Sequence, residues 1–171
     1  MVGLLPPGQP GLSFPSCAPD PLSFSGTFDY SLDAKNRLTV PAKYRAVFAG
    51  GAKIALPPPL AEGRVRTVAF WPLANYEEFA ANTLKGLNPY STKARRLQQR
   101  LYGNSWDCEL DAANRLLIPP EARAYAGLSK DVVISGAKDF LEVWDRDVHA
   151  AYNAELLADP TELVDDSADF D

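Results

Sequence analysis

A seven-residue phrase occurs twice in this chain. Residues 32–38 read LDAKNRL and residues 110–116 read LDAANRL, so only one position differs. The match extends over SLDAKNRLTVPAKYR (31–45) and ELDAANRLLIPPEAR (109–123), in which Leu, Asp, Ala, Asn, Arg, Leu, Pro and the final Arg recur. An internal repeat of this kind predicts two copies of one structural unit within the 171 residues.

The two copies predict the same order of elements. Short β-prone runs follow each phrase, Pro stands where a helix would begin and Gly where it would end. Further on, VAFWP (68–72) resembles LEVWD (141–145), and a helical stretch follows each. Each copy therefore predicts strand, turn, strand, short helix, strand, strand and helix, which is an α+β unit. The first copy has an extra loop at 57–64, and a helix within 91–104 joins the copies.

The repeated phrase predicts a tight turn. Its Asp can accept backbone N–H bonds as in an Asx-turn, its Asn tolerates positive φ, and its Arg begins the next strand. Two interpretations stay open from the residues alone: a hairpin with Asp and Arg paired across the turn, or a turn that also binds a ligand. The residues concerned are Asp33, Asn36 and Arg37 in the first copy, and Asp111, Asn114 and Arg115 in the second.

Charge is distributed unevenly along the chain, whose net charge is −5. Residues 24–106 contain 12 Lys and Arg against 5 Asp and Glu, whereas residues 107–154 contain 5 against 9. The last 17 residues, 155–171, contain seven acids and no base. This asymmetry predicts a polyanionic partner for the first half and a solvating acidic tail.

Several classes of protein are disfavoured by composition. With two cysteines, one histidine (His149) and no metal-ligand or catalytic motif, the chain predicts no disulfide framework, metal, cofactor, small-molecule substrate or enzymatic activity. No apolar run approaches the roughly 20 residues that span a bilayer. The first 21 residues lack Lys and Arg and are interrupted by prolines, so they do not predict a signal peptide. We expect a cytoplasmic protein with no membrane partner.

Three stretches carry a resemblance to a known family: GTFDYSLDAKNRLTVPAKYR, FWPLANYEEF and DAANRLLIPPEARAYAGLSKDVVISGAKDFLEVWD. In this order, over about residues 24–156, the chain resembles the MraZ family of bacterial transcriptional regulators. The resemblance implies two tandem AbrB-like modules, whose interleaved β-hairpins form a small barrel with short helices. The expected organisation is a flexible Pro-rich extension (1–23), module 1 (24–88), a connecting helix (89–106), module 2 (107–156) and a flexible acidic tail (157–171). Deletion of residues 1–21 or 158–171 is expected to leave the fold intact.

The resemblance also implies a function. Family members bind double-stranded DNA at promoter direct repeats, including their own promoter in the division and cell-wall gene cluster, and form ring-shaped homo-oligomers. We therefore expect a nucleoid-associated regulator without a cofactor. The basic residues of the first copy are the candidate DNA contacts, although a solvated helix face also explains the last two: Lys35, Arg37, Lys43 and Arg45.

The second copy is expected to be structural. Ala113 replaces the lysine of the phrase, and acidic side chains are expected to crowd Arg115: Asp107, Glu109 and Glu121. The chain also departs from the family pattern, since Asn replaces the usual Gly of both turns and Ser25 replaces a basic residue between Phe24 and Gly26. A self-assembling protein scaffold that does not bind specific DNA is the alternative function.

Overall fold

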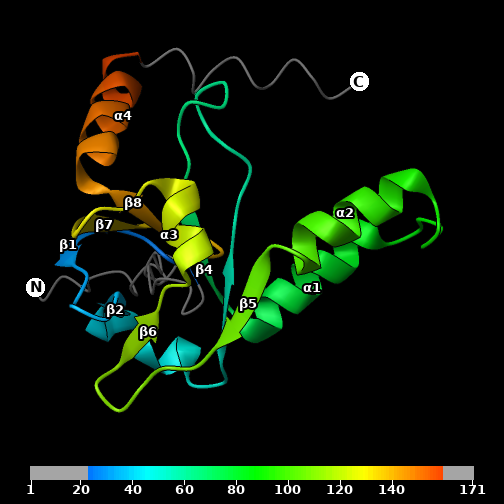
Figure 1. The fold of residues 1–171 in the computed structure, drawn as a ribbon, viewed down its shortest axis with the longest axis horizontal. Coiled ribbons are helices and arrows are strands. Elements are labelled where there is room, and N and C mark those ends of the chain that lie inside the picture. Colours follow the sequence, from blue (N-terminus) through cyan, green and yellow to red (C-terminus); the bar gives the residue numbers. More distant parts are fainter. Residues whose placement is uncertain (1–22, 160–171) are drawn as a thin grey trace, which may run out of the picture.

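The computed structural model describes residues 23–159, so the predicted extension and tail lie almost entirely outside it. Each copy has the predicted order of elements, and the predicted connecting helix is present between them (Figure 1). The elements are β1 (Thr27–Ser31), β2 (Arg37–Thr39), the 3₁₀ helix η1 (Ala42–Phe48), β3 (Ala52–Ala55), β4 (Val68–Pro72), α1 (Leu73–Leu84), α2 (Thr92–Tyr102), β5 (Ser105–Cys108), β6 (Arg115–Leu117), α3 (Pro120–Ala126), β7 (Asp131–Gly136), β8 (Leu141–Asp145) and α4 (Arg146–Ala158).

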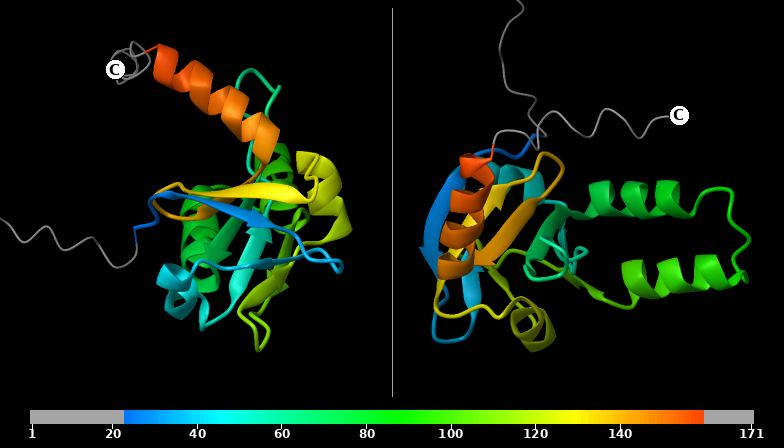
Figure 2. Two further views of the ribbon diagram at one scale, coloured as in Figure 1. Left: turned by 90° about the vertical axis from the view of Figure 1, so that its left-hand side faces the viewer. Right: turned by 90° about the horizontal axis from the view of Figure 1, so that it is seen from above.

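The strands of the two copies are interleaved in one body. A six-stranded sheet has the order β1-β7-β8-β4-β3-β5, in which β1 pairs with β7 and β5 pairs with β3. Each copy thus gives its first strand to the hairpin of the other copy (Figure 2). The order runs from an edge at β1 to an edge at β5, so the sheet does not close and the expected small barrel is not confirmed in the described residues.

An approximate two-fold axis relates the copies. Strands β2 and β6 form a separate antiparallel pair in which Leu38 lies opposite Leu116. Strands β4 and β8 meet at the middle of the large sheet, with Ala69 opposite Glu142. In both strand pairs, replacing each residue by its equivalent in the other copy gives the same set of partners. The repeated phrases therefore meet at the axis because their strands pair with each other.

The main hydrophobic core contains side chains from both copies. Leu38 and Leu116 are fully buried, and Val40 and Ile118 are almost fully buried beside them. Burial of one such side chain contributes about 1.5–3 kcal/mol relative to leaving it exposed. Because the copies share this core, neither half can bury its apolar side chains without the other.

Helices α1 and α2 form a hairpin that projects from the body (Figures 1 and 2). Ser91 caps α2, as predicted, by accepting a hydrogen bond from the amide of Ala94 at 3.1 Å. A second core joins the hairpin to the sheet through Trp71, Tyr76, Ala80 and Leu101, and the Tyr76 hydroxyl donates to the Leu101 carbonyl at 2.6 Å. No helix of the described residues is long and apolar enough to cross a membrane.

Candidate nucleic-acid interface

The first turn is held by one carboxylate. Oδ1 of Asp33 accepts hydrogen bonds from the amides of Lys35 and Arg37, each at 2.9 Å. Oδ2 of the same carboxylate accepts from Nε of Arg37 at 2.7 Å. The predicted Asx-turn is therefore confirmed, and Asp33 and Arg37 pair across the turn, as in the first of the two interpretations left open by the sequence.

The second turn has the same geometry. Asp111 accepts from the amides of Ala113 and Arg115 at 2.9 and 3.0 Å, and from Nε of Arg115 at 2.9 Å. Asn36 and Asn114 have φ of 60° and 58°, so both occupy the left-handed region for which Asn was predicted. Since Asn tolerates this region, both turns form with Asn at this position.

The two turns lie side by side and contact each other. The amide of Val40 donates to the Asn114 carbonyl at 2.9 Å, and the amide of Ile118 donates to the Asn36 carbonyl at 3.1 Å. Across the axis, Nη1 of Arg115 lies 3.3 Å from Oδ2 of Asp33. The reciprocal pair, Nη1 of Arg37 and Oδ2 of Asp111, is separated by 3.6 Å. These four side chains form a closed ion-pair cluster, the turn quartet (Asp33, Arg37, Asp111 and Arg115).

The quartet favours ionised carboxylates. Hydrogen bonds, first that from the Arg37 backbone amide, lower the pKa of Asp33. For Asp111, desolvation opposes the shift, but the amides of Arg115 and Ala113 and the Arg115 guanidinium outweigh it and lower the pKa. The cluster is partly open to solvent, since the side chains of Arg37 and Arg115 are 29% and 28% exposed. The two arginines therefore have nearly the same environment.

Lys35 distinguishes the copies. It is exposed on the first turn, and no ion pair or hydrogen bond of its ammonium group is found among residues 23–159. The equivalent position in the second turn is Ala113, so the quartet is flanked by an unpaired cation on one side only.

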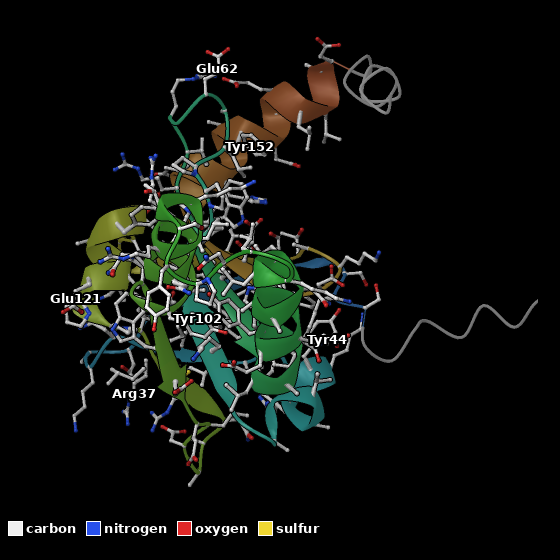
Figure 3. The ribbon with its side chains drawn as sticks, turned by 90° about the vertical axis from the view of Figure 1, so that its right-hand side faces the viewer. Arg37, Tyr44, Glu62, Tyr102, Glu121 and Tyr152 are labelled. Atoms are coloured by element: carbon white, nitrogen blue, oxygen red, sulfur yellow. The ribbon has the colours of Figure 1, made fainter. Side chains whose placement is uncertain are left out.

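Arg37 and Glu121 lie on the same side of the molecule, away from Glu62 and Tyr152 at its other end (Figure 3).

The other two candidates have local contacts. Nε of Arg45 donates to the Val40 carbonyl at 3.1 Å, and the side chain lines a surface cavity together with Asp111 and Asn114. Nζ of Lys43 lies 3.5 Å from Oγ of Ser25 and 5.0 Å from the ring centre of Tyr44. The structure thus brings Arg45 near the second turn, whereas Lys43 contacts the segment before β1.

None of the three acids expected to crowd Arg115 forms an ion pair with it among residues 23–159. Its ion-pair partners within residues 23–159 are Asp111 and Asp33. Asp107 instead accepts from Nζ of Lys53 at 2.7 Å, because β5 pairs with β3 and places the two residues opposite each other. Lys53 is 6% exposed, and although burial alone would lower its pKa, the bond to Asp107 raises it overall. This ion pair between a buried lysine and an exposed aspartate was not predicted, since a sequence does not show which strands pair.

A cationic surface on α2 was also missed as a candidate site. The helix contains four Lys or Arg residues and no acid, and all four are exposed. None of them forms an ion pair with another described residue. A charge count along the helix could have identified these residues: Lys93, Arg95, Arg96 and Arg100.

Other kinds of site find little support in residues 23–159. No group of His, Cys, Asp and Glu side chains there could hold a metal ion. His149 packs against Trp144 at 5.4 Å between ring centres, and burial lowers its pKa although Asp29 opposes the shift. Cys108 is a free thiol, and burial raises its pKa to about 11. The candidate site among the described residues is therefore the surface formed by the paired turns and the exposed cations.

Comparison with known proteins finds the same family that the sequence resembles. The model of the MraZ protein family, described as antitoxin-like, matches residues 23–101 and again 101–169. A protein of Symbiobacterium thermophilum named transcriptional regulator MraZ is 35% identical over 82% of this chain and 96% of its own length. Proteins of the same name from Corynebacterium diphtheriae (37% identical; 79% and 90% covered) and Mycolicibacterium gilvum (35% identical; 75% and 85% covered) are also similar.

Proposed function

The chain belongs to the MraZ family, and from this premise we propose that it is a transcriptional regulator that binds double-stranded DNA through its paired turns. The observation that carries the proposal is the turn quartet. It holds two guanidinium groups at one surface, with Lys35 exposed beside them. The relatives' printed name, transcriptional regulator, supports the same function.

The chemistry of the turns suits DNA. An arginine has five N–H donors, and the contacts within the quartet use Nε and Nη1 of each guanidinium. Nη2 is left to donate to a phosphate or, together with Nη1, to the O6 and N7 atoms of guanine. We assign Lys35 and Arg37 to DNA contact, with Arg45 and Lys43 as flanking phosphate contacts. Both arginines of the quartet hold the turns, and the lysine beside Arg37 favours the first turn for DNA contact.

Oligomerisation is part of this proposal. Among residues 23–159, no strand pairs with the outer edges of β1 and β5, and exposed edges favour pairing with another chain. A ring of subunits would present the turns repeatedly, which suits direct repeats in a promoter. The operator we propose is the protein's own promoter within the division and cell-wall gene cluster. Light scattering that finds a monodisperse monomer of 18.6 kDa would contradict the ring.

The test of DNA binding is a fluorescence-anisotropy titration of the promoter duplex at several salt concentrations. Because phosphate contacts release counterions, affinity should fall steeply as salt increases, and an unrelated duplex should bind more weakly. A self-assembling scaffold is the alternative function, and it predicts an oligomer without salt-dependent DNA binding. Equal and weak affinity for both duplexes, in a protein that is fully oligomeric, would favour the scaffold.

A further inference from the structure

An apolar groove lies between the α1–α2 hairpin and the β7–β8 turn. Its volume is about 360 Å³, and its walls are mainly aromatic and aliphatic side chains: Trp71, Tyr76, Phe79, Leu97, Leu101 and Phe140. The indole of Trp71 stacks on Phe79 and Phe140, with ring centres 5.0 and 4.6 Å apart. Phe79 remains 42% exposed although its ring is part of this stack. A large aromatic ring exposed in an apolar groove indicates a binding surface.

The N-terminal segment of the chain enters the structure beside this groove. Ser23 lines a neighbouring cavity that shares Trp71, Phe79 and Asp139 with the groove. The next residue, Phe24, is 2% exposed and exchanges two backbone hydrogen bonds with Lys138, at 2.8 and 3.0 Å. The described part of the chain therefore begins beside the groove, at Ser23.

The composition of residues 1–22 matches the groove. This stretch, MVGLLPPGQPGLSFPSCAPDPL, contains six prolines, and Asp20 is its one charged side chain. Pro-rich segments favour the polyproline II conformation, which loses little entropy on binding and docks in grooves lined by aromatic rings. Residues 160–171 contain five acids and no base, so burying them in an apolar groove would be costly.

We propose that residues 1–22 bind in the groove between α1, α2 and the β7–β8 turn of the same molecule. The proposal does not depend on DNA binding. Five residues lie between Cys17 and Ser23, so the Cα atoms of these two residues can be at most about 22 Å apart. Leu12 and Phe14 lie further along the segment and supply apolar side chains for the groove.

Cross-linking of Cys17 tests the proposal in the full-length chain. In a Cys108→Ser background, Thr83→Cys places a thiol on the wall of the groove, and Ala81→Cys places one on the opposite, exposed face of α1. A short bismaleimide should link Cys17 to position 83 several-fold faster than to position 81, within one molecule. Leu12→Ser with Phe14→Ser should abolish this difference. Circular dichroism and melting temperature establish that each variant is folded.

Each result has a definite meaning. Preferential cross-linking at position 83 that mass spectrometry finds within one chain, and that the double serine variant loses, supports the proposal. Equal rates at positions 81 and 83 in folded protein would overturn it, because tethering alone would then explain the reaction. Cross-links between two chains would also overturn it, since a second copy would be the occupant. Normal DNA binding by these variants would show that the proposed DNA-binding function does not require residues 1–22 to occupy the groove.

Discussion

Nη1 of Arg115 lies 3.3 Å from Oδ2 of Asp33, a residue 82 positions earlier in the chain. The reciprocal contact of Arg37 with Asp111 makes the two turns one unit. Removal of Arg37 would leave both carboxylates without one of their cations.

Arg37→Ala and Arg115→Ala should therefore lower the melting temperature by similar, modest amounts. Each arginine contacts both carboxylates and is exposed to nearly the same extent. Partly exposed ion pairs contribute little individually, and a closed cluster contributes more. Thermal melts of the two variants and the parent at one ionic strength measure the effect. A loss confined to Arg115→Ala would show that the quartet is not energetically symmetric.

Lys35 should affect DNA binding without affecting stability. It has an exposed ammonium group beside the quartet and no ion-pair partner among the described residues. Lys35→Ala should reduce the slope of log affinity against log salt by about one unit, as expected for loss of one phosphate contact. Titrations at four or more salt concentrations give this slope.

The matched control for Lys35 is Ala113→Lys, which places a lysine at the equivalent position of the second turn. If both turns approach the DNA, this variant should increase the slope. If only the first turn does, the slope should not change. An unchanged slope for Lys35→Ala, in protein that melts like the parent, would remove Lys35 from the interface.

Local signals in the sequence predicted the elements well. The Asn of each turn, the Ser91 cap and the prolines before the short helices each specify backbone geometry within a few residues. Partners across the chain were harder to predict. The pairing of β5 with β3, and hence of Asp107 with Lys53, depends on which strands meet in the sheet. The repeat itself showed that the turns were alike, but their contact depends on the register of β2 and β6.

Gly136→Ala should destabilise the fold. A Cβ atom at this position would lie 2.3 Å from the amide nitrogen of Ser25, and that neighbour is backbone, which cannot move aside cheaply. Overpacking of this kind costs about 1–3 kcal/mol. Gly50→Ala is the control, because a Cβ there would meet no atom within 4 Å. Urea unfolding of both variants should show a clear loss only for Gly136→Ala, and equal stability would indicate that the segment at Ser25 is readily displaced.

Glu142 should make stability depend on pH. Burial raises the pKa of its carboxyl group, although a hydrogen bond from the Thr67 hydroxyl at 3.0 Å opposes the shift. Since the folded-state pKa exceeds the unfolded value near 4.5, folding is favoured while the group is protonated. This contribution is full below the unfolded pKa, decreases as pH rises through the folded pKa, and is absent above it.

Glu142→Gln should remove this dependence while keeping an oxygen that can accept from Thr67. The difference in unfolding free energy between the variant and the parent should therefore increase from pH 4 to pH 7 in favour of the variant, because the other carboxylates cancel in the comparison. Urea unfolding of the variant and the parent at several pH values measures this difference. A variant that loses stability relative to the parent as pH rises would show that the ionised Glu142 carboxylate is stabilised in the fold rather than penalised by its burial.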